Sequence, residues 1–162
     1  MKMIKKIKIT KSWNKPIYRD IIDVRSPLEY DEDHIIGSKN FPVLYNEQRN
    51  LIGKIYKQVN PFKAKIIGSS IIAKNIAKHI EKNFQNKSGS WKPLIYCWRG
   101  GQRSRALALI LQEIGWQPYL LHGGYKKYRQ DVMDLLNHIS PKLKLWSIGG
   151  KTGTAKTKIL SA

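Results

Sequence analysis

The stretch "LIYCWRGGQRSRALALILQEIG", residues 94–115, joins three patterns that together decide the fold. It opens with the short apolar run 94–98, which is typical of a buried strand. A glycine-rich turn follows, and residues 103–115 then place apolar side chains at helical spacing as far as Gly115, a residue suited to end a helix. A strand, a tight loop and a helix in this order indicate one unit of a parallel sheet.

The same alternation recurs along the chain. Strand patterns occur at 18–24, 118–124 and 142–150, and helix patterns at 69–84 and 125–139. Residues 43–68 have no clean period and are predicted to mix helix and loop, with Ser69 or Ser70 as the cap of the next helix. We therefore predict an α/β fold in which helices wrap a parallel sheet.

The basic composition can be explained in two ways, by binding to a polyanion or by a bias of the coding sequence. The chain has 162 residues, enough for one domain with a core, and 41% of them are hydrophobic. Thirty Lys and Arg against eleven Asp and Glu give a net charge of +19, which favours nucleic acid as a partner. The lysines are scattered from Lys2 to Lys158, however, and an AT-rich coding sequence would produce the same excess.

Cysteine use and hydropathy predict the compartment. The single cysteine, Cys97, cannot form an internal disulfide, so no oxidising compartment is implied. No run approaches the roughly 18 apolar residues of a membrane span, and "MKMIKKIKIT" (1–10) lacks the features of a signal peptide. We expect a cytoplasmic protein with no membrane partner.

The loop after Cys97 has the composition of an anion site. Gly100 and Gly101 allow the backbone to curl with its N–H groups pointing inward, and the following helix adds the positive end of its dipole. Arg99 and Arg103 add whole charges, so this field favours the thiolate, the nucleophilic form of cysteine. The alternative is an inert buried cysteine on an apolar strand. Asp23 also ends a strand pattern, and ligands of parallel sheets bind at such ends.

Two motifs resemble the rhodanese family. They are "DVRSPLEYDEDHIIGSKNFP" (23–42) and "YCWRGGQRS" (96–104). Five residues separate Cys97 from Arg103, a loop size that rhodanese-fold phosphatases share with tRNA 2-selenouridine synthases. Those phosphatases carry His before the cysteine, where this chain has Tyr96. Residues 46–76 and "GGYKKYR" (123–129) also resemble the synthases.

The resemblance implies a rhodanese-like domain over 1–140 that transfers sulfur or selenium in the conversion of wobble 2-thiouridine to 2-selenouridine through S-geranyl-2-thiouridine. It implies Cys97 as the catalytic nucleophile, with Asp23 and Arg25 supporting its loop. The anionic donor would be held by Arg99, Gly100, Gly101, Gln102, Arg103 and Ser104. Partners and co-substrates would be tRNA, selenophosphate and geranyl diphosphate, with no tightly bound cofactor and no metal.

The C-terminal stretch "GGKTGTAKT" (149–157) matches the phosphate-binding pattern of a P-loop. Gly150, Lys156 and Thr157 match its fixed positions, and Ala155 replaces the second glycine. Gly153 is a further glycine that we assign to the phosphate-binding remnant. We expect residues 141–162 to be the start of a truncated P-loop domain, with a separately encoded P-loop domain as a candidate partner. The alternatives are a non-catalytic basic tRNA-binding module and a rhodanese-fold phosphatase.

Overall fold

The computed structural model describes residues 6–144, 149–153 and 157. The chain divides into two compact units, 1–130 and 131–162. The first unit contains the sheet and the cysteine loop, so the description of the fold concerns that unit. Among the described residues no helix combines the length and apolar character needed to cross a bilayer.

Five parallel strands form the sheet, which confirms the predicted α/β fold. The strands are β1 (Lys8–Thr10), β2 (Ile21–Asp23), β3 (Ser38–Asn40), β4 (Leu94–Tyr96) and β5 (Tyr119–Leu121), in the spatial order β1-β5-β4-β2-β3. β4 and β2, which carry the predicted site residues at their ends, are central. β1 and β3 were not predicted as strands, because three residues at the edge of a sheet leave no strong apolar alternation.

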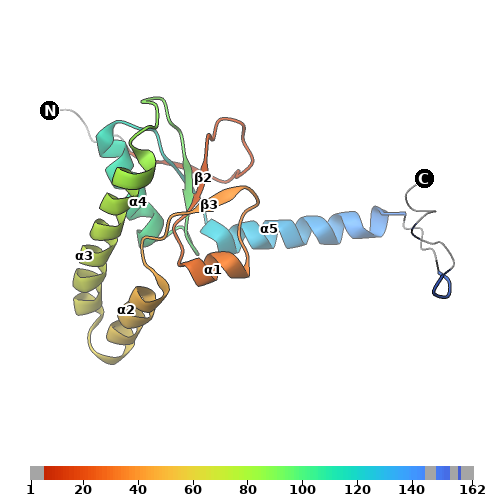
Figure 1. Ribbon diagram of the computed structural model, residues 1–162, viewed down its shortest axis with the longest axis horizontal. Coiled ribbons are helices and arrows are strands. Elements are labelled where there is room, and N and C mark those ends of the chain that lie inside the picture. The colour runs from red at the N-terminus through yellow and green to blue at the C-terminus, as the bar shows by residue number, and fades with distance from the viewer. Residues whose placement is uncertain (1–5, 145–148, 154–156, 158–162) are drawn as a thin grey trace. The chain divides into compact units, whose positions relative to one another are not determined.

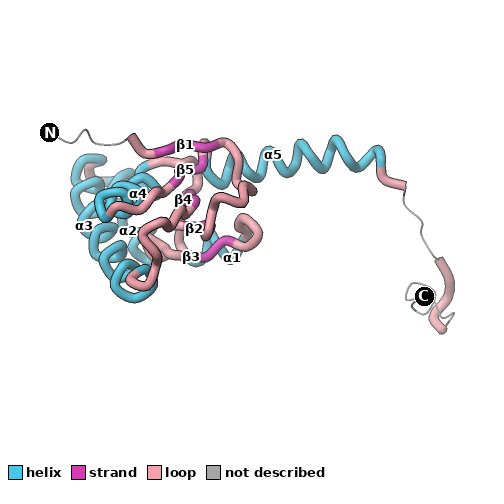
Figure 2. The backbone as a smooth tube through the Cα atoms, turned by 90° about the horizontal axis from the view of Figure 1, so that it is seen from above, coloured by secondary structure: helices cyan, strands magenta, loops and turns pink. Residues whose placement is uncertain are grey.

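Helices cover both faces of this sheet (Figure 1). They are α1 (Pro27–Glu32), α2 (Asn46–Gln58), α3 (Pro61–His79), α4 (Gln102–Ile114) and α5 (Gly124–Ile139), with a π-helical turn, Ile80–Phe84, extending α3. Figure 2 shows α2, α3 and α4 on one side of the strands, and α1 with the first turns of α5 on the other. This is the layered arrangement that alternating strand and helix patterns predict.

Residues 43–68, predicted to mix helix and loop, are mostly helical, and the prediction that the next helix begins at Ser69 or Ser70 was wrong. α2 fills most of this range, and α3 begins at Pro61 rather than near Ser69, which lies inside the helix. The Asn60 side chain caps α3 by accepting hydrogen bonds from the backbone N–H groups of Phe62 and Lys63, at 2.7 and 3.2 Å. None of the residues of α2 is fully buried, and its apolar positions, such as Ile52 and Ile55, form only a short stripe.

The core lies between the sheet and the α3–α4 layer. It is built from strand residues such as Ile22, Ile95 and Leu120, from Leu107 and Leu111 of α4, and from Ile76, Phe84 and Trp91. α4 therefore buries one face against the strands. Its C-terminal end follows the prediction, because Gly115 caps it with φ of 110°, a conformation that favours glycine.

The register of the strands brings the predicted site residues to one edge. Asp23 of β2 pairs with Tyr96 of β4, and on its other side with Asn40 of β3. Cys97 follows Tyr96 immediately, so Asp23 and Cys97 lie at the same carboxyl edge of the sheet. Ligand sites of parallel sheets are found at this edge.

The strand predicted for residues 142–150 does not begin at residue 142 in the structure. Lys142 ends a 3₁₀ turn formed by Ser140–Lys142, in which Pro141 occupies a starting position that suits its fixed φ. Residues 145–148 of this predicted strand lie outside the described residues.

Candidate active site around Cys97

The thiol of Cys97 is held inside the loop that connects β4 to α4. Its side chain is almost fully buried, and the Gly101 backbone N–H points to Sγ at 3.2 Å. The Ser104 hydroxyl lies 3.2 Å from Sγ and 3.1 Å from the Gly101 carbonyl oxygen, to which it donates. Because Ser104 donates to that carbonyl, its position is fixed at the first turn of α4. The sulfur thus faces the Gly101 N–H at a helix N-terminus, a group that stabilises negative charge, and beside it a hydroxyl whose proton is donated to a carbonyl oxygen.

The β5–α5 turn holds the other side of this loop. The N–H groups of Tyr125 and Lys126 donate to the carbonyl oxygens of Cys97 and Trp98, at 2.9 and 3.0 Å. The backbones approach so closely that a Cβ on Gly124 would lie 2.5 Å from the Gly100 nitrogen. Both glycines have positive φ, +60° and +67°, so side chains are excluded by conformation as well as by space.

Asp23 and Arg25 form a buried ion pair beside the loop. Their side chains are 0% and 1% exposed, and Arg25 Nη2 lies 2.7 Å from Asp23 Oδ2. Arg25 Nε donates to both carboxylate oxygens, and Nη2 also donates to the Asp33 carbonyl oxygen at 2.6 Å. Burial would lower the pKa of Arg25, but its hydrogen bonds to Asp23 and the charge of that carboxylate raise it. The pair is therefore charged and fixed.

Arg25 reaches the cysteine loop through an aromatic ring. Its guanidinium lies 3.9 Å from the ring centroid of Tyr125, and that ring is 5.5 Å from the ring of Trp98 in the loop. The Tyr125 hydroxyl donates to Asp33, and burial together with this hydrogen bond raises the pKa of Tyr125 to about 12. Arg25 thus contacts the loop indirectly, by a cation–π contact with Tyr125, and the supporting role of Asp23 and Arg25 stays a prediction.

Arg103 is bound to a carboxylate in this structure. Its Nη1 and Nη2 lie 2.8 and 3.3 Å from the two oxygens of Glu29 in α1, and Arg49 of α2 lies 3.2 Å from Glu29. Burial would raise the pKa of Glu29, but the hydrogen bonds and charge of Arg103, with the hydrogen bonds from Ser26, lower it from 4.5 to about 2. The donor-binding role of Arg103 stays a prediction. Glu29 competes for the same guanidinium.

The remaining predicted residues of the loop are placed as follows. Arg99 and Gln102 are exposed, and in the described chain no hydrogen bond or ion pair is recorded for the Arg99 guanidinium. Tyr96 is buried and hydrogen-bonds to Ser38, and burial with the nearby Asp23 charge raises its pKa. Arg99 is thus a loop cation available for an incoming anion.

The predicted P-loop residues lie in the second unit. Gly150, Gly153 and Thr157 are described, with φ of +88° at Gly153, whereas Ala155 and Lys156 lie outside the described residues. A phosphate-binding role for these residues stays a prediction. Among the described residues no three His, Cys, Asp or Glu side chains gather as a metal site would require.

Two residues of the site, Glu29 and Tyr125, had no predicted role. The pattern 23–42 contains Glu29, but nothing in the sequence indicates that it binds Arg103, because 74 positions separate them. Tyr125 follows two glycines that were interpreted only as the end of a strand. The pair Gly123-Gly124 was the available signal, since adjacent glycines after a strand often mark a close backbone approach.

This geometry can be set beside known proteins. The family model described as "Rhodanese-like domain" matches residues 5–131. The chain belongs to the rhodanese-like domain family. The resemblance predicted from the motifs at 23–42 and 96–104 is thereby confirmed. Cys97 and its loop lie within the matched range.

Within this family, the curated relatives that the chain resembles share one name. The tRNA 2-selenouridine synthases of Nitrosomonas europaea and Psychromonas ingrahamii are 32% and 33% identical to this chain over 86% and 88% of its length. The aligned regions are 37% and 39% of those relatives, so the chain spans about two-fifths of their length. The expected resemblance to this group is confirmed.

A solved structure agrees with the fold. It is the N-terminal domain of a putative ATP/GTP binding protein from Clostridium difficile 630, with 30% identity and a TM-score of 0.62. The match covers 80% of this chain and 92% of that domain. A separately solved domain thus has nearly the same extent as the rhodanese-like unit of this chain.

Proposed function

We propose that this chain carries the chalcogen-transfer centre of a tRNA 2-selenouridine synthase, with Cys97 as the nucleophile. One observation carries the proposal: the Cys97 sulfur is held at 3.2 Å by both the Gly101 N–H and the Ser104 hydroxyl at the start of α4. The Gly101 N–H stabilises a thiolate, and a thiolate attacks a soft chalcogen atom readily.

The proposed step is a displacement on a donor anion. With thiosulfate, the Cys97 thiolate attacks the outer sulfur and forms an S–S bond. The S–S bond of thiosulfate breaks, and sulfite leaves with the electron pair. The persulfide then carries a negative charge. The Gly101 N–H and the positive end of the α4 dipole stabilise that charge. Arg99, exposed beside the loop, attracts the anion.

The substrate and the remaining chemistry are proposed from the relatives. Their name gives tRNA as the substrate and 2-selenouridine as the product, and the net charge of +19 supports binding to a polyanion. Selenophosphate is the proposed selenium donor, and geranyl diphosphate the co-substrate that forms S-geranyl-2-thiouridine. The solved relative named as an ATP/GTP binding protein supports the proposal that a P-loop domain completes the reaction, whether in the same chain or separately encoded.

Persulfide formation tests the proposal. The purified chain is incubated with thiosulfate, and intact-mass spectrometry is used to look for one added sulfur atom, removable by a thiol reductant. We expect loading of the wild type and none of Cys97→Ser. Ser104→Ala should load more slowly, whereas Ser70→Ala, on the exposed side of α3, should load at the wild-type rate. A wild-type chain that gains no sulfur from thiosulfate would contradict the proposal.

A second function, binding of RNA without catalysis, is favoured by the charge alone. If the lysines bind tRNA, the affinity should fall steeply between 50 and 200 mM salt, because bound phosphates release counterions. Filter binding of tRNA to wild type and to Cys97→Ser measures this. Equal affinity of the two with no persulfide formation would favour the binding module. If the chain binds no tRNA even at low salt, the excess of lysine reflects the coding sequence and not a nucleic-acid partner.

A further inference from the structure

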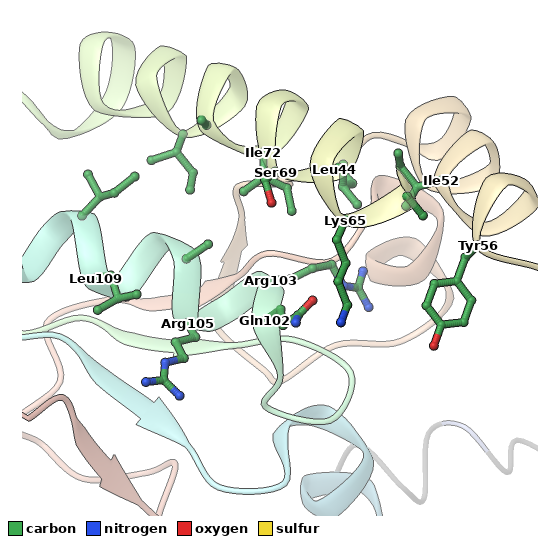
Figure 3. Close-up of a pocket in the computed structure, with 16 residues that line it drawn as sticks. Leu44, Ile52, Tyr56, Lys65, Ser69, Ile72, Gln102, Arg103, Arg105 and Leu109 are labelled. Carbon is green, nitrogen blue, oxygen red and sulfur yellow. The ribbon is translucent and has the colours of Figure 1, made fainter. Parts of the chain in front are cut away.

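Two apolar surfaces of this chain are exposed, and the first is a groove of about 560 Å³ between α2, α3 and α4 (Figure 3). α4 packs on the sheet with Leu107 and Leu111, so the groove lies on the other side of that helix. Leu109 of α4 is 39% exposed in this groove, and Tyr56 of α2 is 55% exposed. An exposed apolar hollow of this kind is typical of a surface that another molecule covers.

Small side chains make this groove accessible to a helix. Four of the lining residues are glycine or alanine: Ala64, Gly68, Ala73 and Ala106. Packed helices lie at a distance set by the side chains at their contact, so small residues let a further helix approach closely. Larger apolar side chains such as Ile72 and Ile110 also line the groove, and a stripe of leucines can pack against them.

The charges of the groove are all positive and lie at one end. Lys65 of α3 and Arg103 and Arg105 of α4 line this end, and in Figure 3 the Lys65 side chain extends towards the first turn of α4. None of the lining residues, all of which belong to the described part of the chain, is acidic. Glu29 binds Arg103 from outside the lining and neutralises one charge, so an excess of positive charge remains.

The second exposed surface is the second half of α5. Four apolar residues at positions i, i+3, i+4 and i+7 form one stripe on this helix, the α5 stripe: Val132, Leu135, Leu136 and Ile139. Leu135 and Leu136 are 55% and 54% exposed, although such a stripe normally faces a core. Asp131 lies beside the start of the stripe, and residues 131–139 contain two aspartates and no lysine or arginine.

The groove and the α5 stripe agree in length and in the direction of their charge. The helix from Val132 to Ile139 is about 10 Å long, and residues 102–110, the part of α4 that lines the groove, span about 12 Å. Each surface carries its charge at the N-terminal end of its helices and apolar side chains beyond it, and the two charges are opposite in sign. Amphipathic helices that bind in grooves use anchors at this spacing, and charge sets their direction.

We propose that α5 of one copy of this chain lies in the groove between α2, α3 and α4 of a second copy. Leu135, Leu136 and Ile139 pack against the apolar walls, and Asp131 faces Lys65 and Arg105 of the second copy. Both surfaces are exposed in the single chain, and a second copy supplies the cover for each of them. This contact goes beyond the proposed function and does not depend on it.

Sedimentation of the purified chain at increasing concentration tests the inference. We expect reversible association with a Kd of about 10 μM, because two helical turns in a groove make a contact at the small end of specific interfaces. A discrete dimer would mean that two copies exchange their α5 helices, and larger assemblies would mean that the contact repeats along an open chain. Either result supports the contact. A monomer at every concentration would overturn the inference and leave another protein domain as the occupant.

Reversal of charge tests the polar end of the contact. Arg105→Glu and Asp131→Arg should each weaken association by about tenfold, because each places like charges together. The double variant Arg105→Glu/Asp131→Arg should recover association, since the exchanged charges then meet with opposite sign. Arg19→Glu is the matched control, because Arg19 is exposed but does not line the groove. Association of the double variant that stays as weak as that of both single variants would contradict the pairing of Asp131 with the cationic end.

Apolar substitutions test the stripe and the wall separately. Leu136→Ser on the α5 stripe and Leu109→Ser in the groove should each weaken association by about tenfold. Both side chains are well exposed in the single chain, so the substitutions should leave the fold intact. The controls are Asn137→Ser, on the side of α5 away from the stripe, and Leu51→Ser, exposed on α2 outside the lining of the groove.

The pattern of these results identifies the surface that meets α5. Association that Leu136→Ser weakens and Leu109→Ser leaves unchanged would overturn the inference, because the α5 stripe would then bind a surface other than the groove. Cys97→Ser should associate as the wild type does and form no persulfide. A failure of this contact is therefore distinguishable from a failure of the proposed chemistry.

Discussion

Replacing Glu29 by Gln should make the stability of the protein less dependent on pH. Glu29 is the carboxylate held by Arg103 and Arg49, and its pKa is lowered from 4.5 to about 2. The folded pKa is depressed, so the stabilisation is present above pH 4.5 and is lost as the pH falls towards 2. A shift of this size corresponds to at most about 3 kcal/mol at neutral pH, falling to about 1.4 kcal/mol near pH 3.

The assay is urea unfolding of wild type and Glu29→Gln at several pH values from 7 down to 3. We expect the difference in the free energy of unfolding to be largest at pH 7 and to shrink below pH 4.5. Glu32→Gln, on the same helix but exposed, is the matched control and should follow the wild type at every pH. A difference between Glu29→Gln and wild type that is constant from pH 7 to pH 3 would refute the assigned ionisation.

Further predictions concern the backbone contact and the buried pair. Gly124→Ala should destabilise the fold by about 2 kcal/mol or more, because the φ of Gly124 is +60° and the added Cβ would meet the cysteine loop. Gly53→Ala is the control: Gly53 has open space around it, so this change should be neutral or stabilising by about 1 kcal/mol. Thermal unfolding measures both, and equal midpoints would contradict the close approach. Arg25→Met should cost about 3–5 kcal/mol by leaving Asp23 buried without its partner. Recovery of stability in the double variant with Asp23→Asn would support this cause, and no recovery would count against it.

The sequence predicted those parts of the fold that local patterns determine. β4, the cysteine loop and α4 follow from an apolar run, two glycines and a helical period that ends at Gly115. α2 was not separated from the neighbouring loops in the prediction, because its apolar stripe is short and none of its residues is fully buried. The short strands β1 and β3 are defined by pairing with distant partners, which a local window does not contain.

For the site too, contacts between residues close in sequence could be predicted, and contacts between distant residues could not. The chemistry of the loop could be predicted, because the residues that surround the sulfur, Gly101 and Ser104, are within seven positions of Cys97. The partner of Arg103 could not, since Glu29 comes from another helix. The link from Arg25 to the loop depends on Tyr125, one hundred residues later, and only the folded chain brings these two side chains into contact.

The hydrogen bonds from Tyr125 and Lys126 to the cysteine loop have a mechanical consequence. The first amides of α5 bind the carbonyl oxygens of Cys97 and Trp98, so the start of this helix is fixed to the loop by backbone groups. Replacement of the Tyr125 or Lys126 side chain therefore leaves this attachment in place. Only proline, which lacks the N–H group, removes one of the two bonds.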